Sequence, residues 1–558
     1  MPRKVAYSGK KKKEQLMAKR QRKGTQNYLK KFASESDDSD DETPPNPRVE
    51  KFHLQPAESH GRGRYALQFF KDSDKEIAQM KQKARDPLVY VDLKDREVTD
   101  QPFENFDFPI RPPWNYKMSK EELDRNENRY FTDYLQKLGE QHQEEGKHLG
   151  LFELNLESWR QLWRVLEISD IVLIIVDIRS PTYMFPPALF TYIKSTLKKD
   201  VVLILNKIDL VRPEVVVAWK HYFLDKYPGI SVALFASYQS RKANNMKVTK
   251  RGPNVKNNGE CALELFKQVK SIVGSELNLT KWEEKIHEDI AASMLEMDAK
   301  ADQEVVVKPE NYQLEEHVRY KNGVLTIGCV GFPNVGKSSI INTLKGHKVV
   351  SVSRTPGHTK YFQTIYLTEN VRLVDCPGLI FPSSTPRGLQ VILGSYPIAQ
   401  LRVPYESIRF VGERLDLPSV LSIQLPPDYS EWSPLAICDA WALRKGFLRA
   451  KTAHPDTYRA ANNILQLVLQ GRIVLDFFPP EFVESEDTWK THPDIAEVEK
   501  IQNKELDNAG QLVHDYSSHS DNEDNKSESS DESSEEASKP ATIPKSGNAF
   551  SLLDDESD

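Results

Sequence analysis

The chain has 558 residues, of which 39% are hydrophobic and 28% are charged, and its formal net charge is −6 at pH 7. This length allows two or three domains with cores of their own, and no run approaches the roughly 20 apolar residues that a membrane-spanning helix needs. The basic N-terminus lacks the apolar segment of a secretory signal, and four widely spaced cysteines predict neither a zinc site nor a disulfide framework.

Residues 1–50 are expected to form a disordered arm that is first basic and then acidic. Its first 31 residues hold twelve Lys or Arg against a single acid, Glu14. Such a run cannot pack into a core, and it favours contact with nucleic acid or nuclear import, although a solvated tail is the open alternative. Residues 51–158 mix polar helical patterns with aromatic and proline-rich pieces, and we predict a mixed helical region without an assigned function.

From Trp159 onward, apolar strands alternate with helical patterns. Strands are expected at 171–177, 201–205 and 231–236, and a second block of the same kind starts at Val324. Such alternation is typical of a parallel sheet. We therefore predict an α/β fold for residues 159–385, a P-loop domain with a mostly parallel sheet, in which helices fill about 186–198, 213–226 and 260–273.

The remainder of the chain is predicted to be helical and then disordered. Residues 386–485 are punctuated by proline and are expected to form a helical C-terminal domain, whereas residues 486–558 form an acidic, serine-rich disordered tail. The expected core of the helical domain includes Trp432, Trp441, Leu443, Phe447 and Leu448.

The segment Gly331-Phe-Pro-Asn-Val-Gly-Lys-Ser338 matches the phosphate-binding loop G-x-x-x-x-G-K-[ST]. An apolar strand precedes it and an amphipathic helix follows, which is the context that such a loop requires. Glycines let backbone N–H groups surround phosphates, and the helix N-terminus adds its positive dipole end. Lys337 is expected to hold the β- and γ-phosphates, and the Ser338 hydroxyl to bind Mg²⁺.

Asn206-Lys-Ile-Asp209 follows a predicted strand, where α/β sheets bind ligands. The Asp209 carboxylate can accept hydrogen bonds from guanine N1–H and the 2-amino group, and it rejects adenine, which lacks that amine. Asn206 can brace the loop, and the stem of Lys207 can lie along the base. Ser237 is a weaker candidate for contacting the base from behind.

Asp375-Cys-Pro-Gly378 ends another predicted strand. Asp375 would reach Mg²⁺ through water, and the Gly378 amide can sense the γ-phosphate, whose loss frees the following loop. Thr359 lies between this motif and the phosphate-binding loop, where a switch threonine would complete the coordination of Mg²⁺. A threonine in a polar loop without such a role is the open alternative.

With these motifs in this order, the sequence resembles the circularly permuted GTPases of the YlqF/YawG type. Their HSR/MMR branch is the closer resemblance, because of Pro186-Pro-Ala-Leu189, Ala218-Trp-Lys-His-Tyr-Phe223 and Cys376-Pro-Gly-Leu-Ile-Phe-Pro382. The resemblance covers roughly residues 160–400 and also includes Asp177-Ile-Arg-Ser-Pro181, the family's D-A-R-x-P with Ile for Ala. It implies work on ribosomal subunits or in the nucleolus. The Asp177 motif has no evident chemistry and reads equally well as an anchor at a strand end.

Catalysis is expected to depart from the common GTPase pattern. Many GTPases place a glutamine after the Asp-x-x-Gly glycine to orient water, but this chain has Leu379 there, and the resembled family shares the apolar replacement. Related loops bind potassium through an asparagine at the position of Asn334. The resemblance therefore implies slow, potassium-assisted hydrolysis that depends on Asn334. The alternative is that Asn334 only braces the loop and a partner supplies the missing group.

We therefore expect a GTP-binding protein and slow GTPase that acts as a switch in ribosome-linked or nuclear RNA processes; a non-enzymatic, GTP-dependent scaffold is the alternative. The basic arm and the basic insertion 238–259 suggest RNA or a pre-ribosomal particle as a partner. We also expect nuclear import factors as partners and no contact with a membrane. The expected distribution is nuclear, nucleolar and cytoplasmic. The expected GTP-binding residues are Asn206, Lys207, Ile208, Asp209, Gly331, Phe332, Pro333, Asn334, Val335, Gly336, Lys337, Ser338, Ser339, Asp375, Cys376, Pro377 and Gly378, with catalysis by Lys337, Asn334 and Gly378 and metal binding by Ser338, Thr359 and Asp375.

Overall fold

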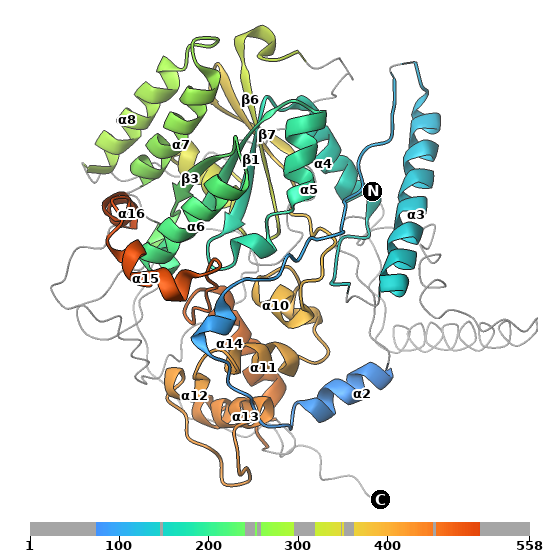
Figure 1. Cartoon of the computed structure of the whole chain (residues 1–558), viewed down its shortest axis with the longest axis vertical. Coiled ribbons are helices and arrows are strands. Elements are labelled where there is room, and N and C mark those ends of the chain that lie inside the picture. The colour runs from blue at the N-terminus through green and yellow to red at the C-terminus, as the bar shows by residue number, and fades with distance from the viewer. Residues whose placement is uncertain are drawn as a thin grey trace, which may run out of the picture. The chain divides into compact units, whose positions relative to one another are not determined.

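A six-stranded sheet with the strand order β3-β2-β1-β6-β8-β7 forms the centre of the described part of the chain (Figure 1). The computed structural model describes residues 74–115, 117–145, 149–239, 252–253, 258–294, 318–347, 349–350, 362–449 and 454–502. The basic arm, most of the basic insertion, Thr359 and the acidic tail beyond Gln502 lie outside these residues. The strands of the sheet are β1 Ile171–Asp177, β2 Asp200–Asn206, β3 Ser231–Phe235, β6 Leu325–Gly331, β7 Gln363–Thr368 and β8 Val371–Asp375.

Five of these strands are parallel, as the sequence predicts. β1 is buried over its whole length and pairs with β2 on one side and with β6 on the other. Continuous apolar strands fit this position because helices cover both faces of a parallel sheet. β7 was not predicted; it pairs antiparallel with β8 and is the last strand in the order, at the sheet's edge. The expected mostly parallel α/β fold is confirmed.

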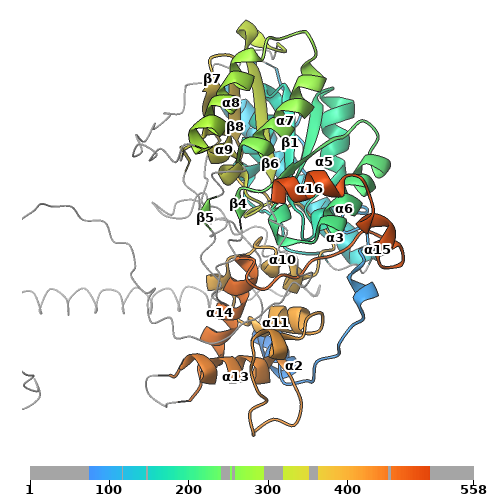
Figure 2. The same ribbon diagram turned by 90° about the vertical axis from the view of Figure 1, so that its left-hand side faces the viewer.

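Helices cover both faces of the sheet. In Figures 1 and 2, α7, α8 and α9 lie over one face, and α4 and α5 lie over the other. The helix expected at 186–198 is instead a short α-helix that continues as a π-helical turn, Tyr192–Thr196. The helices around the sheet are α4 Leu156–Ile168, α5 Pro187–Thr191, α6 Pro213–Lys226, α7 Asn258–Val273, α8 Thr280–Met294 and α9 Lys337–Lys345.

The region 51–158 does not form a body of its own where it is described. Its helix α2 (Asp74–Lys83) contacts α11 of the C-terminal helical region, and Leu88 N–H donates to Trp432 O. The later part packs beside the sheet instead: α3 (Lys120–Glu145) and the strap before it, residues 107–115, contact α4. Residues expected to be one mixed region therefore divide between two neighbours.

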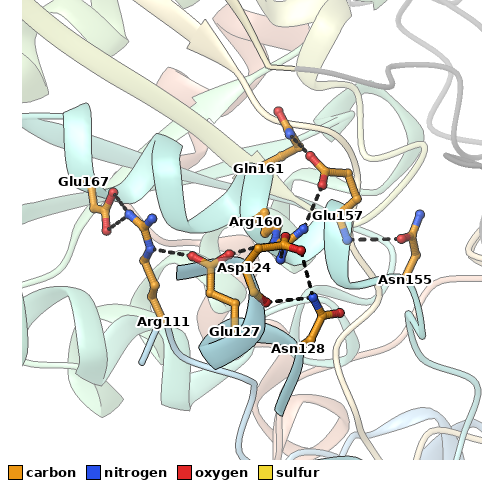
Figure 3. A network of polar contacts seen from close by, with 9 residues as sticks. All are labelled: Arg111, Asp124, Glu127, Asn128, Asn155, Glu157, Arg160, Gln161 and Glu167. Carbon is orange, nitrogen blue, oxygen red and sulfur yellow. Dashed lines mark hydrogen bonds and ion pairs between the residues drawn. The ribbon is translucent and has the colours of Figure 1, made fainter. Parts of the chain in front are cut away.

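A network of charged side chains joins α3 and its strap to α4 (Figure 3). Arg111 lies between Glu127 and Glu167, with N···O distances of 3.1 and 2.7 Å. Arg160 of α4 contacts Glu127 at 2.8 Å and also pairs with Asp124 and Glu157. Because Arg111 and Glu127 are almost fully buried, each charge requires the partners that the network provides.

The helical C-terminal region extends further than the sequence indicates. Two helices lie at or beyond the expected start of the acidic tail at residue 486, and Val498 and Ile501 are buried there. Of the expected core residues, Trp441 is buried, but Leu443 and Leu448 are about half exposed, at 53% and 51%. The helices are α10 Arg387–Ile392, α11 Tyr405–Gly412, α12 Leu417–Val420, α13 Pro434–Lys445, α14 Thr457–Leu469, α15 Phe482–Lys490 and α16 Ile495–Gln502. Within the described residues, no helix combines the length and apolarity needed to cross a membrane.

Candidate guanine-nucleotide site

The phosphate-binding loop connects β6 to α9 and depends on two glycines. Gly331 and Gly336 have φ angles of 154° and 105°, which side chains rarely adopt, and a Cβ on Gly331 would lie 2.4 Å from the carbonyl oxygen of Ile175. Lys337 opens α9, and its ammonium donates to the carbonyls of Gly331 and Phe332 at 3.0 and 2.7 Å. Burial lowers the pKa of Lys337, and Asp375 partly opposes this. The lysine therefore lies over the loop that would enclose the phosphates.

The predicted base-recognition loop is attached directly to the phosphate-binding loop. Asn206 Nδ2 donates to Val335 O at 2.6 Å, and a Cβ on Gly336 would lie 2.3 Å from that nitrogen. Lys207 Nζ donates to Asn334 O at 2.7 Å. These contacts join the carboxyl ends of β2 and β6, because parallel strands end at the same edge of the sheet. The bracing role expected of Asn206 agrees with this geometry.

Polar atoms face this edge from β2 and β3. Asp209 is half-buried in the 3-10 turn Ile208–Leu210, directly after Asn206 and Lys207. Ser237, after β3, is buried, and its hydroxyl has no hydrogen-bond partner among the described residues. Buried hydroxyls are normally hydrogen-bonded. The orphaned Ser237 hydroxyl and the Asp209 carboxylate fit a polar ligand such as guanine.

Asp177, to which the sequence assigned no chemistry, organises this edge. Its carboxylate contacts Lys207 Nζ and the Arg179 guanidinium, each at 2.8 Å. Burial would raise the pKa of Asp177, but the two cations outweigh it and hold that pKa far below its usual range. The interpretation as a strand-end anchor is therefore incomplete, because the carboxylate also positions Lys207 of the base loop. The sequence did hold a signal for this contact, because Asp177 ends β1 and Lys207 directly follows β2, the strand predicted next along the chain.

Asp375 and Ser338 form the candidate magnesium site. Ser338 Oγ donates to Asp375 Oδ2 at 3.1 Å, while Asp375 Oδ1 is buried without a hydrogen-bond partner in the described part of the chain. Burial raises the pKa of Asp375 to about 6, against the lowering effects of Lys337 and Ser338. A buried carboxylate oxygen without a partner beside a hydroxyl fits a hard divalent cation that prefers oxygen ligands. Thr359, the third expected ligand, lies outside the described residues.

Gly378 touches the phosphate-binding loop so closely that no larger residue fits. A Cβ there would lie 2.8 Å from Pro333 Cα and 3.1 Å from Lys337 Nζ. The next residue, Leu379, is fully buried, and its N–H donates to Gly331 O at 3.3 Å. The Asp-x-x-Gly segment therefore lies beside the Lys337 ammonium. The other expected residues occupy the same loops: Ile208, Phe332, Pro333, Val335, Cys376 and Pro377 are buried, as is Ser339 in the first turn of α9.

The segment after Gly378 is braced by residues that sequence reasoning did not connect with the site. Glu153 N–H donates to Ile380 O at 3.0 Å, and Gly150 N–H donates to Ser383 O at 2.8 Å. Phe381 packs against Trp159 and Phe332, with ring centroids 5.3 and 5.7 Å apart. These contacts hold the segment between the loop and the region N-terminal to α4.

Two further contacts lead from the site to the helical region. Asn334 Nδ2 donates to Gly394 O, in the turn after α10, at 2.9 Å. Arg179 donates to Val468 O of α14 at 2.9 Å, and its own carbonyl accepts a bond from Phe477 N–H. The loops at the edge of the sheet thus contact the C-terminal helices through both Asn334 and Arg179.

Comparisons with known proteins match this chain to GTPases. The family model described as "50S ribosome-binding GTPase" matches residues 326–395, which include the phosphate-binding loop and the Asp-x-x-Gly segment. Guanine nucleotide-binding protein-like 1 of Homo sapiens is 42% identical over 549 residues, 90% of each chain. Large subunit GTPase 1 of Schizosaccharomyces pombe is 33% identical over 68% of this chain and 59% of its own. Among solved structures, GNP-bound YlqF from T. maritima is 18% identical with a TM-score of 0.33, covering 58% of this chain and 98% of its own.

Proposed function

Because this chain belongs to the circularly permuted GTPases of the HSR/MMR branch, together with the guanine nucleotide-binding protein-like proteins, we propose that it is a slow GTPase whose nucleotide state is passed to its helical C-terminal region. The observation that carries the proposal is the meeting of three loops at one sheet edge. Asn206 and Lys207 contact the phosphate-binding loop directly, and Gly378 lies against Lys337.

Each loop has a separate task in this proposal. Asp209 accepts hydrogen bonds from the guanine edge, and Lys337 neutralises charge on the β- and γ-phosphates. Ser338 and Asp375 hold Mg²⁺, which when bound supplies positive charge to the phosphate oxygens. The Gly378 amide reports the γ-phosphate, since its position beside Lys337 admits no side chain. Loss of the γ-phosphate then releases the segment that Gly150 and Glu153 brace.

Slow turnover follows from the side chain after Gly378. Leu379 is buried and apolar, so it cannot orient an attacking water as a glutamine does. We propose that a potassium ion, bound in part by the amide oxygen of Asn334, offsets charge on the leaving oxygen. The bond from Asn334 Nδ2 to Gly394 O would fix the amide in that orientation. The buried Leu379 equally favours the alternative, a GTP-dependent scaffold with negligible turnover.

The partner in this proposal is RNA or a pre-ribosomal particle. The matching family model is described as a 50S ribosome-binding GTPase, the S. pombe relative is named a large subunit GTPase, and the basic arm 1–31 can contact phosphate backbones. The same arm would recruit import factors and give a nuclear and nucleolar as well as a cytoplasmic distribution. Contact of this kind is sequence-independent and weakens as salt rises.

Single-turnover hydrolysis separates the GTPase from the scaffold. The full chain is loaded with GTP, and phosphate release is followed alone, with RNA and with large ribosomal subunits. The Lys337→Ala variant, prepared identically, controls for contaminating GTPases. We expect slow release by the parent chain and acceleration by one of the partners. Release no faster than that of the variant in every mixture would leave only the scaffold.

A further inference from the structure

A cluster of metal-ligating side chains lies where the C-terminal helices cross α6, away from the nucleotide loops. His221 of α6 meets His492 and Asp494, which lie in the turn between α15 and α16. One ligand atom from each of the three lies within 4.8 Å of the others. Figures 1 and 2 both place α15 and α16 beside α6.

The distances match those of a small tetrahedral site. His221 Nε2 is 3.3 Å from Asp494 Oδ2, and His492 Nδ1 is 3.8 Å from Asp494 Oδ1. Zinc bound tetrahedrally at about 2.0–2.1 Å from nitrogen and oxygen ligands keeps those ligands about 3.4 Å apart. The Asp494 amide donates to His492 Nδ1 at 3.2 Å, which is at the long end for such a bond, so a metal could replace it.

The charged groups around the site leave it with a negative charge and with room for a further ligand. Lys220 Nζ contacts Asp494 Oδ2 at 2.9 Å and Glu497 at 3.2 Å, so one ammonium faces two carboxylates and leaves a net charge of −1 when both imidazoles are neutral. Trp489 covers the histidines, with ring centroids 5.7 Å from His221 and 5.9 Å from His492. The three side chains remain about 26–30% exposed, which leaves room for a fourth ligand from solvent.

We propose that His221, His492 and Asp494 bind Zn²⁺, which fastens the turn between α15 and α16 to α6. The attachment bears on the nucleotide site, because Gln502 at the end of α16 donates to the carbonyls of Ile208 and Val211 at 2.7 and 3.1 Å. Ile208 belongs to the guanine-recognition loop. Bound zinc therefore holds α16 against the backbone of that loop.

Zinc titration of the full chain by calorimetry tests the proposal, with His287→Gln as the control because His287 is exposed on α8. His221→Gln, His492→Gln and Asp494→Asn should each weaken binding by roughly tenfold or more, since losing even an outer partner of a metal ligand costs about 10- to 100-fold. Lys220→Met should instead tighten binding, because it removes a positive charge beside Asp494. Circular dichroism checks that each variant is folded. If one ligand variant unfolds, the other two ligand variants test the site.

Hydrogen exchange locates the bound ion. Zinc should slow exchange in residues 482–502 and in α6 of the parent chain, and it should not do so in His492→Gln. Absence of zinc binding by the parent chain, equal affinities in the parent and all three ligand variants, or weaker binding by Lys220→Met would each overturn the assignment. Protection confined to other segments would also overturn it, because zinc would then bind elsewhere.

Discussion

Asn334 of the phosphate-binding loop donates its side-chain amide to the carbonyl of Gly394, 2.9 Å away in the turn after α10. The contact leaves no space for a side chain at Gly394, because a Cβ there would lie 2.9 Å from Asn334 Nδ2. The backbone carbonyl of Asn334 also accepts the ammonium of Lys207. One residue therefore touches Lys207 of the predicted base loop through its backbone and the helical region through its side chain, which links the loops of the candidate site directly to the helices.

If the Asn334 amide helps to bind potassium, turnover should depend on both the ion and the residue. We expect faster single-turnover hydrolysis in potassium than in matched sodium buffer for the parent chain, and no difference for Asn334→Ala. Asn128→Ala, on the exposed surface of α3, serves as the control and should keep the dependence. Equal rates for the parent chain in both buffers would remove the cation mechanism and favour a group supplied by a partner.

Lys337→Ala should weaken GTP and GDP binding by roughly 10- to 150-fold, because a charge-assisted hydrogen bond contributes about 1.5–3 kcal/mol. Ser338→Asn should weaken binding mainly when magnesium is present. Fluorescent-nucleotide titration measures both effects, and Lys345→Ala on the same helix controls for a general loss of charge. Far-UV circular dichroism should remain almost unchanged. Global unfolding of Lys337→Ala would mean that the loop is a structural turn rather than a ligand site.

Asp177→Asn should lower the free energy of unfolding by about 3–5 kcal/mol, because it leaves the buried Arg179 and the Lys207 ammonium without their anion. The depressed pKa of Asp177 means that the unfolded chain takes up the proton first. Its contribution is therefore complete above about pH 4 and is lost as the pH falls further. Urea unfolding at neutral and acidic pH measures this. Asp200→Asn, a half-exposed ion-pair partner, should cost about 1 kcal/mol or less.

Deleting residues 1–31 should move the protein largely to the cytoplasm, because the deletion removes twelve basic side chains. Imaging of tagged full-length and truncated chains in cells measures the distribution. Deletion of the acidic stretch 34–42 is the matched control and should leave nuclear accumulation intact. An unchanged distribution after the first deletion would leave the arm as a solvated tail.

Elements with a strong local pattern could be predicted closely from the sequence. β1 and α6 begin and end where they were expected, because a continuous apolar run marks β1 and Pro213 marks the first turn of α6. β8 ends at the predicted Asp375. The placement of Asn206 and Asp375 beside the phosphate-binding loop also followed, since parallel strands end at one edge of the sheet.

Contacts between distant segments could not be predicted, because no local pattern encodes them. The pairing of Glu153 with Ile380 joins residues more than two hundred positions apart, and neither sequence context suggests it. Leu443 and Leu448 were expected in the core, but their apolar character does not show that Leu443 faces outward on α13 or that Leu448, beyond the end of that helix, is half exposed. α16 was missed because acidic residues lie beside its buried apolar side chains, Val498 and Ile501.

The most direct test of the account is the base specificity of Asp209→Asn. Affinities for GTP, XTP and ATP are measured for the parent chain, for this variant and for Asp225→Asn, an exposed control on α6. The parent and the control should prefer GTP. The variant should lose roughly 10²- to 10⁴-fold in GTP affinity and gain XTP binding, because an amide can donate to the 2-oxo group of xanthine where a carboxylate only accepts. Equal binding of ATP and GTP by the parent chain, or an unchanged preference in Asp209→Asn, would contradict the assignment of this loop to guanine.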